Sequence, residues 1–232
     1  MKILLVANGF PPSAFGGVEV YSDDLAHELT RRGHKVWVFC RESDAQRLDY
    51  EVLVSEIDGI SVTRVVNDFK RVHRFSELYT DEVIDRIFAS LLDDFRPDLV
   101  HFNHFLALSI GLPAEARKPR IPGIATLHDY WVICHRVNLV NSEKKICPGP
   151  HQGANCYRCL LNSAKGPNTI MGLLKRILPY PVRVKLRQIL HRAPEAKIIL
   201  PAAPRDFVKR DQEFPEALSG MDTLIVTSQY VR

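Results

Sequence analysis

The first forty residues constrain the fold more than any other stretch of this chain. An unbroken apolar run from Ile3 to Ala7 is typical of a central parallel strand that is covered on both faces. A turn over residues 8–17 follows, and an amphipathic helix is then predicted from apolar residues at helical spacing: Val18, Tyr21, Leu25 and Leu29. Gly33 ends this helix, and a second apolar run over residues 36–40 begins almost at once. The stretch therefore predicts a βαβ unit, the building block of an α/β fold with a parallel sheet.

A pair of glycines, Gly16 and Gly17, stands at the predicted start of the crossover helix. A helix N-terminus presents unpaired N–H groups and the positive end of the helix dipole, and glycine lets a phosphate or a sugar approach the backbone closely. The same two glycines also fit a tight turn that binds nothing. From the residues alone, both interpretations stay open.

Further strands and helices are expected along the rest of the chain. Strands are predicted over residues 60–66, 99–102, 124–127, 196–200 and 223–227. Helices are predicted over residues 77–95, 105–117 and 204–218. Residues 41–59 are polar and acidic and predict a loop. The fold class is therefore α/β, with a Rossmann-like parallel sheet and helices on both faces.

Composition favours one globular domain. The chain has 232 residues, of which 46% are hydrophobic and 25% charged, and two full Rossmann domains do not fit in that length. The apolar run at residues 3–7 is shorter than the core of a secretion signal. No stretch approaches the roughly 18 uninterrupted apolar residues of a membrane span. We therefore expect a cytoplasmic protein.

Polar side chains follow two of the predicted strands at the points where they end. Asn103 and His104 follow the strand at residues 99–102, and His128 and Asp129 follow the strand at residues 124–127. In open α/β sheets, ligands bind outside the carboxyl ends of the strands. These residues are therefore candidates for binding, and hydrogen bonding within the loops is the alternative role of the histidines.

Five short motifs resemble glycosyltransferase family 4 of the GT-B class. They are Ala7-Asn8-Gly9-Phe10-Pro11-Pro12, Gly16-Gly17-Val18-Glu19, Arg32-Gly33-His34-Lys35-Val36, Pro97-Asp98-Leu99-Val100-His101 and Thr126-Leu127-His128-Asp129. The resemblance covers nearly the whole chain. It implies a retaining transferase that moves a sugar from a nucleotide-sugar to a glycan, lipid or small-molecule acceptor.

The resemblance also assigns roles to residues. It implies that Gly16 and Gly17 contact the donor diphosphate or the acceptor, and that Glu19 is part of the site. His128 is expected to lie close to the transferred sugar, as the catalytic residue. Asn103 and Asp129 are expected to bind substrate beside it.

The family carries a second Rossmann-like domain that holds most of the nucleotide-sugar. No sequence of that kind is found within residues 1–232. We therefore expect a single N-terminal, acceptor-side domain whose C-terminal donor-binding domain is absent, and which is inactive alone.

Four cysteines gather in a predicted insertion over about residues 131–165, in the pattern C-x12-C-x8-C-x2-C: Cys134, Cys147, Cys156 and Cys159. The closing C-x2-C favours a structural zinc site, since disulfides are rare in intracellular proteins. A redox-active or disulfide pair at Cys156 and Cys159, and separate packed thiols, are the alternatives. Some members of family 4 carry a similar cysteine-bearing insertion.

A basic segment follows the cysteines. Residues 165–192 hold seven Lys or Arg and no Asp or Glu. A helix docked on the sheet with a basic outer face is one interpretation. The other is peripheral contact with anionic lipid at the inner face of the membrane.

Two other classes of protein fit parts of the sequence. A nicotinamide-dependent dehydrogenase also begins with a strand, glycines and a helix, and Glu42 stands where a ribose-binding acid is expected, but the G-x-G-x-x-G spacing is absent. A zinc-stabilised nucleic-acid-binding module fits the cysteines and the basic segment, but it lacks interleaved aromatic residues. We therefore expect no nucleic-acid partner.

Overall fold

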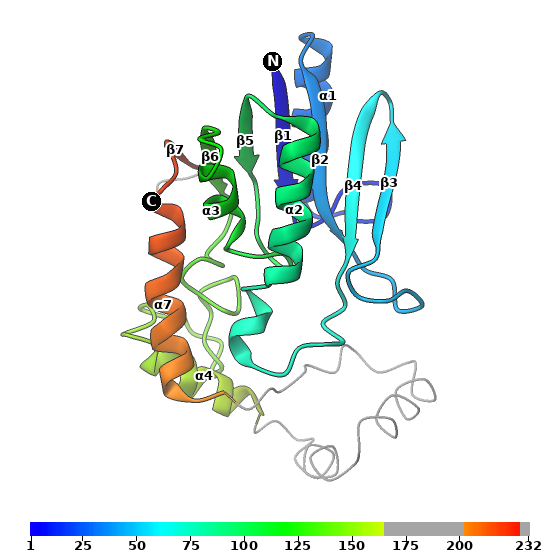
Figure 1. Ribbon diagram of the computed structural model, residues 1–232. Coiled ribbons are helices and arrows are strands. Elements are labelled where there is room, and N and C mark those ends of the chain that lie inside the picture. The colour runs from blue at the N-terminus through cyan, green and yellow to red at the C-terminus, as the bar shows by residue number, and fades with distance from the viewer. Residues whose placement is uncertain (165–201, 228–232) are drawn as a thin grey trace.

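A computed structural model describes residues 1–164 and 202–227 of the chain (Figure 1). Seven strands form one sheet in the order β3-β4-β2-β1-β5-β6-β7. The strands are β1 (Lys2–Ala7), β2 (Lys35–Glu42), β3 (Val52–Ile57), β4 (Ile60–Val66), β5 (Leu99–Phe102), β6 (Gly123–Leu127) and β7 (Thr223–Val226). The helices are α1 (Gly17–Arg31), the 3₁₀ turn η1 (Phe75–Leu78), α2 (Glu82–Phe95), α3 (Leu112–Arg117), α4 (Ala154–Ala164) and α7 (Pro204–Leu218).

The sheet is parallel except at one edge. β1 lies at its centre, where Ile3 is opposite Val36 of β2 and Leu99 of β5. Only β3 runs antiparallel to its neighbour β4 among the pairs that the structure describes. All residues of β1 after Lys2 are buried, as expected of a strand covered on both faces.

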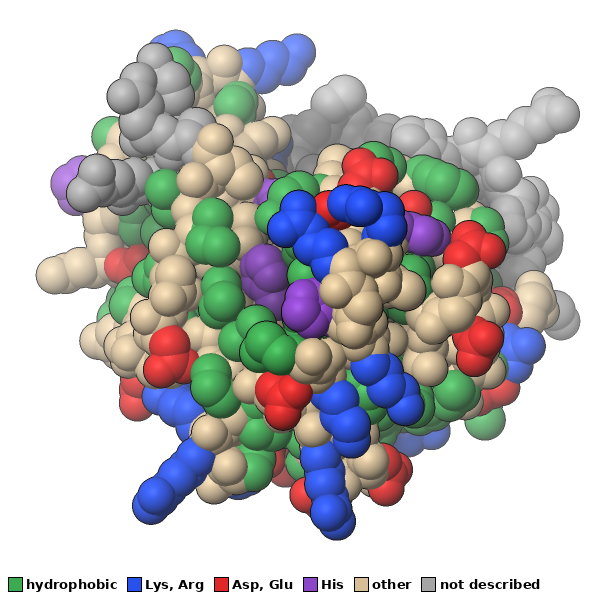
Figure 2. Space-filling model, turned by 90° about the horizontal axis from the view of Figure 1, so that it is seen from above, with side chains coloured by type: hydrophobic (Ala, Val, Ile, Leu, Met, Phe, Trp, Pro, Cys, Tyr) green, Lys and Arg blue, Asp and Glu red, His purple; other side chains and the backbone are tan. Residues whose placement is uncertain are grey.

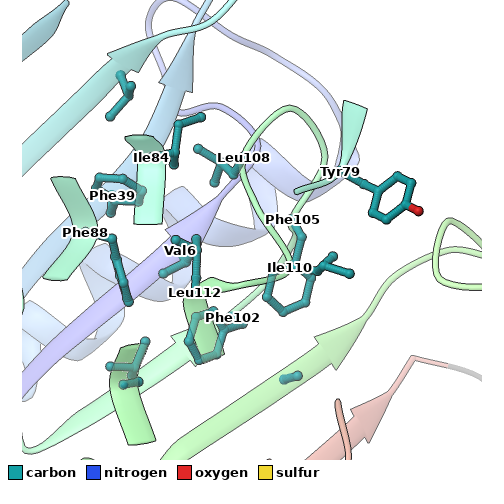
Figure 3. Close-up of a cluster of buried hydrophobic side chains, with 14 of the residues drawn as sticks. Val6, Phe39, Tyr79, Ile84, Phe88, Phe102, Phe105, Leu108, Ile110 and Leu112 are labelled. Carbon is teal, nitrogen blue, oxygen red and sulfur yellow. The ribbon is translucent and has the colours of Figure 1, made fainter. Parts of the chain in front are cut away.

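Helices cover both faces of the sheet, which confirms the predicted fold class. α1 and α2 lie on opposite sides of it (Figure 1). Ala26 of α1 packs with Leu5 and Val38 in one apolar cluster. The larger cluster lies on the α2 side and includes the labelled side chains of Figure 3, among them Phe88 and Phe102. Apolar side chains buried on both faces are the main source of stability for a sheet of this kind.

The predicted loop over residues 41–59 is partly wrong, because it contains β3. Asp58 and Gly59 both have positive φ, 50° and 81°, and join β3 to β4 by a two-residue hairpin turn. Asp-Gly is a favoured sequence for such a turn and indicates a hairpin. The loop was predicted because residues 41–59 as a whole are polar and acidic.

Two predicted helices are shorter than expected. α2 begins at Glu82 rather than near residue 77, because the Asp81 carboxylate accepts hydrogen bonds from the N–H groups of Val83 and Ile84 and so caps the helix there. The helix expected over residues 105–117 is reduced to α3. The helix over residues 204–218 and the last strand are confirmed.

The expected zinc site is not supported by the structure. All four cysteines are described, yet no group of three or more His, Cys, Asp or Glu side chains within residues 1–164 and 202–227 is placed to hold a metal ion. Cys156 belongs to the apolar core, and burial raises the pKa of its thiol to about 11. The cysteine-rich stretch instead forms a series of turns followed by α4.

Two further expectations lie outside the described residues: the strand over residues 196–200 and the membrane contact of residues 165–192. Within the described part of the chain, none of the helices has the length and apolar character needed to span a bilayer.

Candidate functional site

A small pocket opens at the carboxyl ends of β5 and β6. Its lining residues come from the two strand ends and the loops that follow them: Asn103, His104, Phe105, Thr126, Leu127, His128, Asp129, Trp131 and Val132. This is the edge at which ligands bind in open α/β sheets. The structure therefore brings together three of the predicted site residues: Asn103, His128 and Asp129.

Asn103 is buried, with 1% of its surface exposed, and its amide orientation is fixed by α1. The hydroxyl of Ser22 donates to the carbonyl of Val18 at 2.7 Å, so the Ser22 oxygen accepts the hydrogen bond from Asn103 Nδ2 at 3.1 Å. Asn103 Oδ1 is therefore the acceptor end of the amide, and it has no hydrogen-bond partner. A buried and unpartnered carbonyl oxygen is uncommon, and a hydroxyl group of a ligand or a water molecule can donate to it.

His104 and Asp129 form a hydrogen-bonded pair beside Asn103. The N–H of Leu106 donates to His104 Nδ1 at 2.9 Å, which places the ring proton on Nε2. That nitrogen donates to Asp129 Oδ2 at 3.2 Å, while the N–H of Trp131 donates to Asp129 Oδ1 at 2.8 Å. Burial alone would raise the pKa of Asp129, but these hydrogen bonds, led by that of His104, bring it below its ordinary value. The carboxyl is therefore ionised at neutral pH.

His128 stands between the pocket and α1. Its ring meets the ring of Tyr21 edge to face, with centroids 4.6 Å apart. Its Nε2 atom is buried and has no hydrogen-bond partner. Burial lowers the pKa of His128, and the nearby His104 lowers it further. His128 thus presents a neutral imidazole with one nitrogen available to a ligand.

His101 lies beneath the pocket rather than in it. Its Nε2 is 2.7 Å from the hydroxyl oxygen of Thr126 on the neighbouring strand, and burial lowers the pKa of His101 to about 4. His101 therefore has the alternative role expected of these histidines, which is hydrogen bonding within the protein.

The glycine pair is exposed at the start of α1, where Gly16 is the N-cap. Neither glycine lines the pocket. The Glu19 carboxylate lies against Gly16, because a Cβ added there would stand 2.4 Å from Glu19 Oε2. Asn8 Nδ2 donates to Glu19 Oε1 at 2.7 Å and holds it in this position. A carboxylate therefore occupies the space over the helix N-terminus where a bound anion is expected.

Two buried arginines support the site, and sequence reasoning did not identify them. Arg64 pairs with Glu42 at 3.3 Å and donates to the carbonyl of Pro11 at 3.0 Å, which anchors the loop before the glycine pair. Glu42 also accepts from Ser13 at 2.7 Å, so it is not available to hold a ribose as the dehydrogenase alternative requires.

Arg210 of α7 is 5% exposed and fixes the loop after β6. Its guanidinium donates to the carbonyls of Trp131 and Val132 and lies 4.1 Å from the centroid of the Phe214 ring. Nothing in the local sequence signals this contact, because α7 follows the loop by some 70 residues.

The opposite end of the sheet differs in character. Figure 2 views the molecule from the end at which the N-terminus lies in Figure 1, and there basic and acidic side chains are interspersed. The pocket with its unpartnered polar atoms lies at the other end, where the parallel strands finish.

A parallel sheet with helices on both faces and a polar pocket at its carboxyl edge defines a Rossmann-like ligand-binding domain. The sequence pattern of Glycosyltransferase Family 4 matches residues 15–155, which include this pocket. The chain belongs to glycosyltransferase family 4.

Among curated proteins, the chain is similar to an uncharacterized 42.6 kDa protein in the cps region of Klebsiella pneumoniae. The two are 30% identical over 142 residues, which cover 57% of this chain and 38% of that protein. Among solved structures, the chain is similar to sucrose-phosphate synthase from Thermosynechococcus elongatus, with 17% identity and a TM-score of 0.43 over 70% of this chain and 39% of that one. The catalytic domain of starch synthase IV from Arabidopsis thaliana, bound to ADP and acarbose, gives 15% identity and a TM-score of 0.38 over 56% and 34%.

Proposed function

We propose that this chain provides the acceptor-side domain of a retaining glycosyltransferase that transfers a sugar from a nucleotide-sugar. The observation that carries the proposal is the pair of unpartnered atoms, His128 Nε2 and Asn103 Oδ1, in one pocket of a family 4 chain. Each atom is suited to hold a ligand hydroxyl.

In this proposal, the pocket positions the acceptor. The Asn103 carbonyl accepts a hydrogen bond from an acceptor hydroxyl, neutral His128 exchanges one through Nε2, and Asp129 orients the attacking hydroxyl. Fixing the nucleophile against the anomeric carbon lowers the entropic part of the barrier. Gly16 and Gly17 are exposed at the start of α1, and a leaving diphosphate that reached their N–H groups would displace the Glu19 carboxylate, which lies against Gly16.

Donor binding is proposed to depend on more than this domain. The chain spans 38% of the length of the curated relative that it matches. We expect the 232-residue chain to bind acceptor glycosides in the pocket, to bind nucleotide-sugars weakly and to transfer sugar at a negligible rate.

The test follows the histidine ring signals of the ¹⁵N-labelled chain by NMR while a panel of methyl glycosides and sugar phosphates is added. We expect the signals of His128 and His104 to shift, and the shifts to vanish in His128→Ala. The matched control is His34→Gln, because His34 lies at the amino end of the sheet, where its ring meets the N-terminus. It should leave binding unchanged.

Two results would contradict the proposal. The first is the absence of any shift at the pocket with every compound of the panel. The second is efficient sugar transfer by the chain alone, which would place donor binding and catalysis within these residues.

A further inference from the structure

We propose that the acceptor group held in this pocket is an uncharged hydroxyl-bearing sugar or polyol rather than a phosphorylated one. The inference rests on the function proposed above and specifies its substrate class. It follows from the hydrogen-bond acceptors of the pocket, from the charge of the pocket, and from the Glu19 carboxylate that lies at the start of α1.

The pocket presents hydrogen-bond acceptors at Asn103 and Asp129. Asn103 Oδ1 accepts only, because its amide is oriented by Ser22. Asp129 is ionised and also accepts only. The group of the ligand that meets Asn103 Oδ1 or Asp129 must therefore be a donor, and a hydroxyl group is one whereas a phosphate dianion is not.

Charge also disfavours a phosphate in this pocket. Among residues 1–164 and 202–227, no Lys or Arg lines it. The proton of His104 is directed at Asp129, and burial keeps His128 neutral by lowering its pKa. The lining therefore places the carboxylate of Asp129 in the pocket with no Lys or Arg of the described residues to balance it, which disfavours a second anion.

The start of α1 is the usual place for a phosphate in folds of this kind. Glu19 Oε2 lies against Gly16, and Asn8 holds the carboxylate there by a 2.7 Å hydrogen bond. Tyr21, two residues further along α1, touches His128 in the pocket. A phosphate that bound at this helix start would therefore meet the negative charge of Glu19.

The two buried arginines near the site do not reverse this balance. Arg64 donates hydrogen bonds to Pro11 and Ser55 and forms an ion pair with the carboxylate of Glu42. Arg210 donates to main-chain carbonyls behind the pocket wall and is enclosed by aromatic rings. Neither guanidinium lines the pocket.

The experiment compares matched ligands on the whole chain. Methyl glycosides of glucose, galactose and mannose are titrated against their 6-phosphates and against inorganic phosphate, with the His128 ring signal as the readout. We expect at least one neutral glycoside to bind about tenfold more tightly than its phosphate, a difference of the size that repulsion of one charge pair produces.

A charge variant tests the cause. Glu19→Gln keeps the size of the side chain and removes its charge, and we expect it to raise affinity for the 6-phosphates and for inorganic phosphate more than affinity for the neutral glycosides. The matched control is Glu56→Gln, because Glu56 is exposed on the edge strand β3, and the same change of net charge there should have no effect.

The outcomes separate this inference from the function on which it rests. Equal or tighter binding of the 6-phosphates by the unaltered chain overturns the inference and leaves the acceptor site in place. Unchanged phosphate affinity in Glu19→Gln overturns the role of Glu19. Absence of binding by every sugar overturns the proposed function itself.

Discussion

Ser22 fixes the orientation of the Asn103 amide so that its oxygen is left as a hydrogen-bond acceptor, although Ser22 itself does not line the pocket. Its hydroxyl links the carbonyl of Val18 to the amide of Asn103, and it is fully buried. The sequence placed Asn103 at the site, because polar residues after a parallel strand predict binding. It did not reveal which end of the amide faces the ligand, since that depends on a side chain 81 residues away.

Replacing Ser22 by alanine is expected to lower the free energy of unfolding by about 1–2 kcal/mol, because Asn103 Nδ2 then loses its partner in a buried site. The released amide can turn its Nδ2 toward the pocket, so neutral glycosides should bind more weakly. Urea unfolding and the NMR titration measure the two effects. Thr30→Ala is the control, because Thr30 makes the same bond to the carbonyl four residues earlier in α1, at 2.8 Å, and lies outside the pocket.

His101 is expected to make stability depend on pH. Its pKa is lowered by burial to about 4, against an ordinary value of 6.5, so below pH 6.5 the unfolded chain binds the proton more readily. Stability contributed by His101 is complete above pH 6.5 and declines toward pH 4, by roughly 3 kcal/mol in all.

Asp85 acts in the opposite sense, because burial raises its pKa to about 6 and the folded chain then holds the extra proton. The contribution of His101 is therefore measured as a difference. Urea unfolding of the unaltered chain and of His101→Gln between pH 7 and pH 4 should give stabilities that converge as the pH falls. Parallel curves would show that His101 titrates normally in the folded state.

The sequence predicted the position of α7 correctly, but it did not predict that Arg210 of this helix contacts the loop beside the pocket. Its bounds, Pro204–Leu218, agree with the predicted helix, because apolar residues at helical spacing mark the buried face. Phe207 and Phe214 enter the core, and Arg210 between them reaches the loop beside the pocket. Such a contact between distant segments leaves no periodic signal, which is why it was missed.

Gly153 tests how closely α7 packs on the cysteine-rich stretch. It has a φ of 80°, and a Cβ there would lie 2.6 Å from the backbone of Phe207. Gly153→Ala is expected to cost about 1–2 kcal/mol for the left-handed conformation and about 1–3 kcal/mol more for the clash.

The control is Gly33→Ala, because Gly33 has a φ of 83° and nothing within 4 Å of the added Cβ. It isolates the conformational part of the cost. Melting temperature and urea midpoint compare the two variants, and equal losses in both would mean that α7 does not press on Gly153.

At the scale of the whole molecule, the fold class was predictable and one edge of the sheet was not. Continuous apolar runs such as Ile3–Ala7 predict the buried strands near the N-terminus. β3 is an edge strand with exposed Val52 and Val54, and its mixed composition resembles a loop. The spacing of the cysteines fits a metal site, but within residues 1–164 and 202–227 no group of three or more His, Cys, Asp or Glu side chains is placed to hold an ion, and Cys156 packs in the apolar core.

Chelation is expected to leave the whole molecule unchanged. Because no metal-binding group forms within residues 1–164 and 202–227, dialysis against EDTA should not alter the melting temperature. Elemental analysis of the purified chain should find less than stoichiometric zinc. A fall of several degrees after chelation, reversed by added zinc, would contradict the structure of the cysteine-rich stretch.

The contact of Arg210 with the loop after β6 also bears on the order in which the chain is made. A nascent chain that has left the ribosome as far as residue 200 carries the strands β1 to β6, yet it lacks the helix that braces the wall of the pocket. The wall of the pocket is therefore braced only after six of the seven described strands have been synthesised.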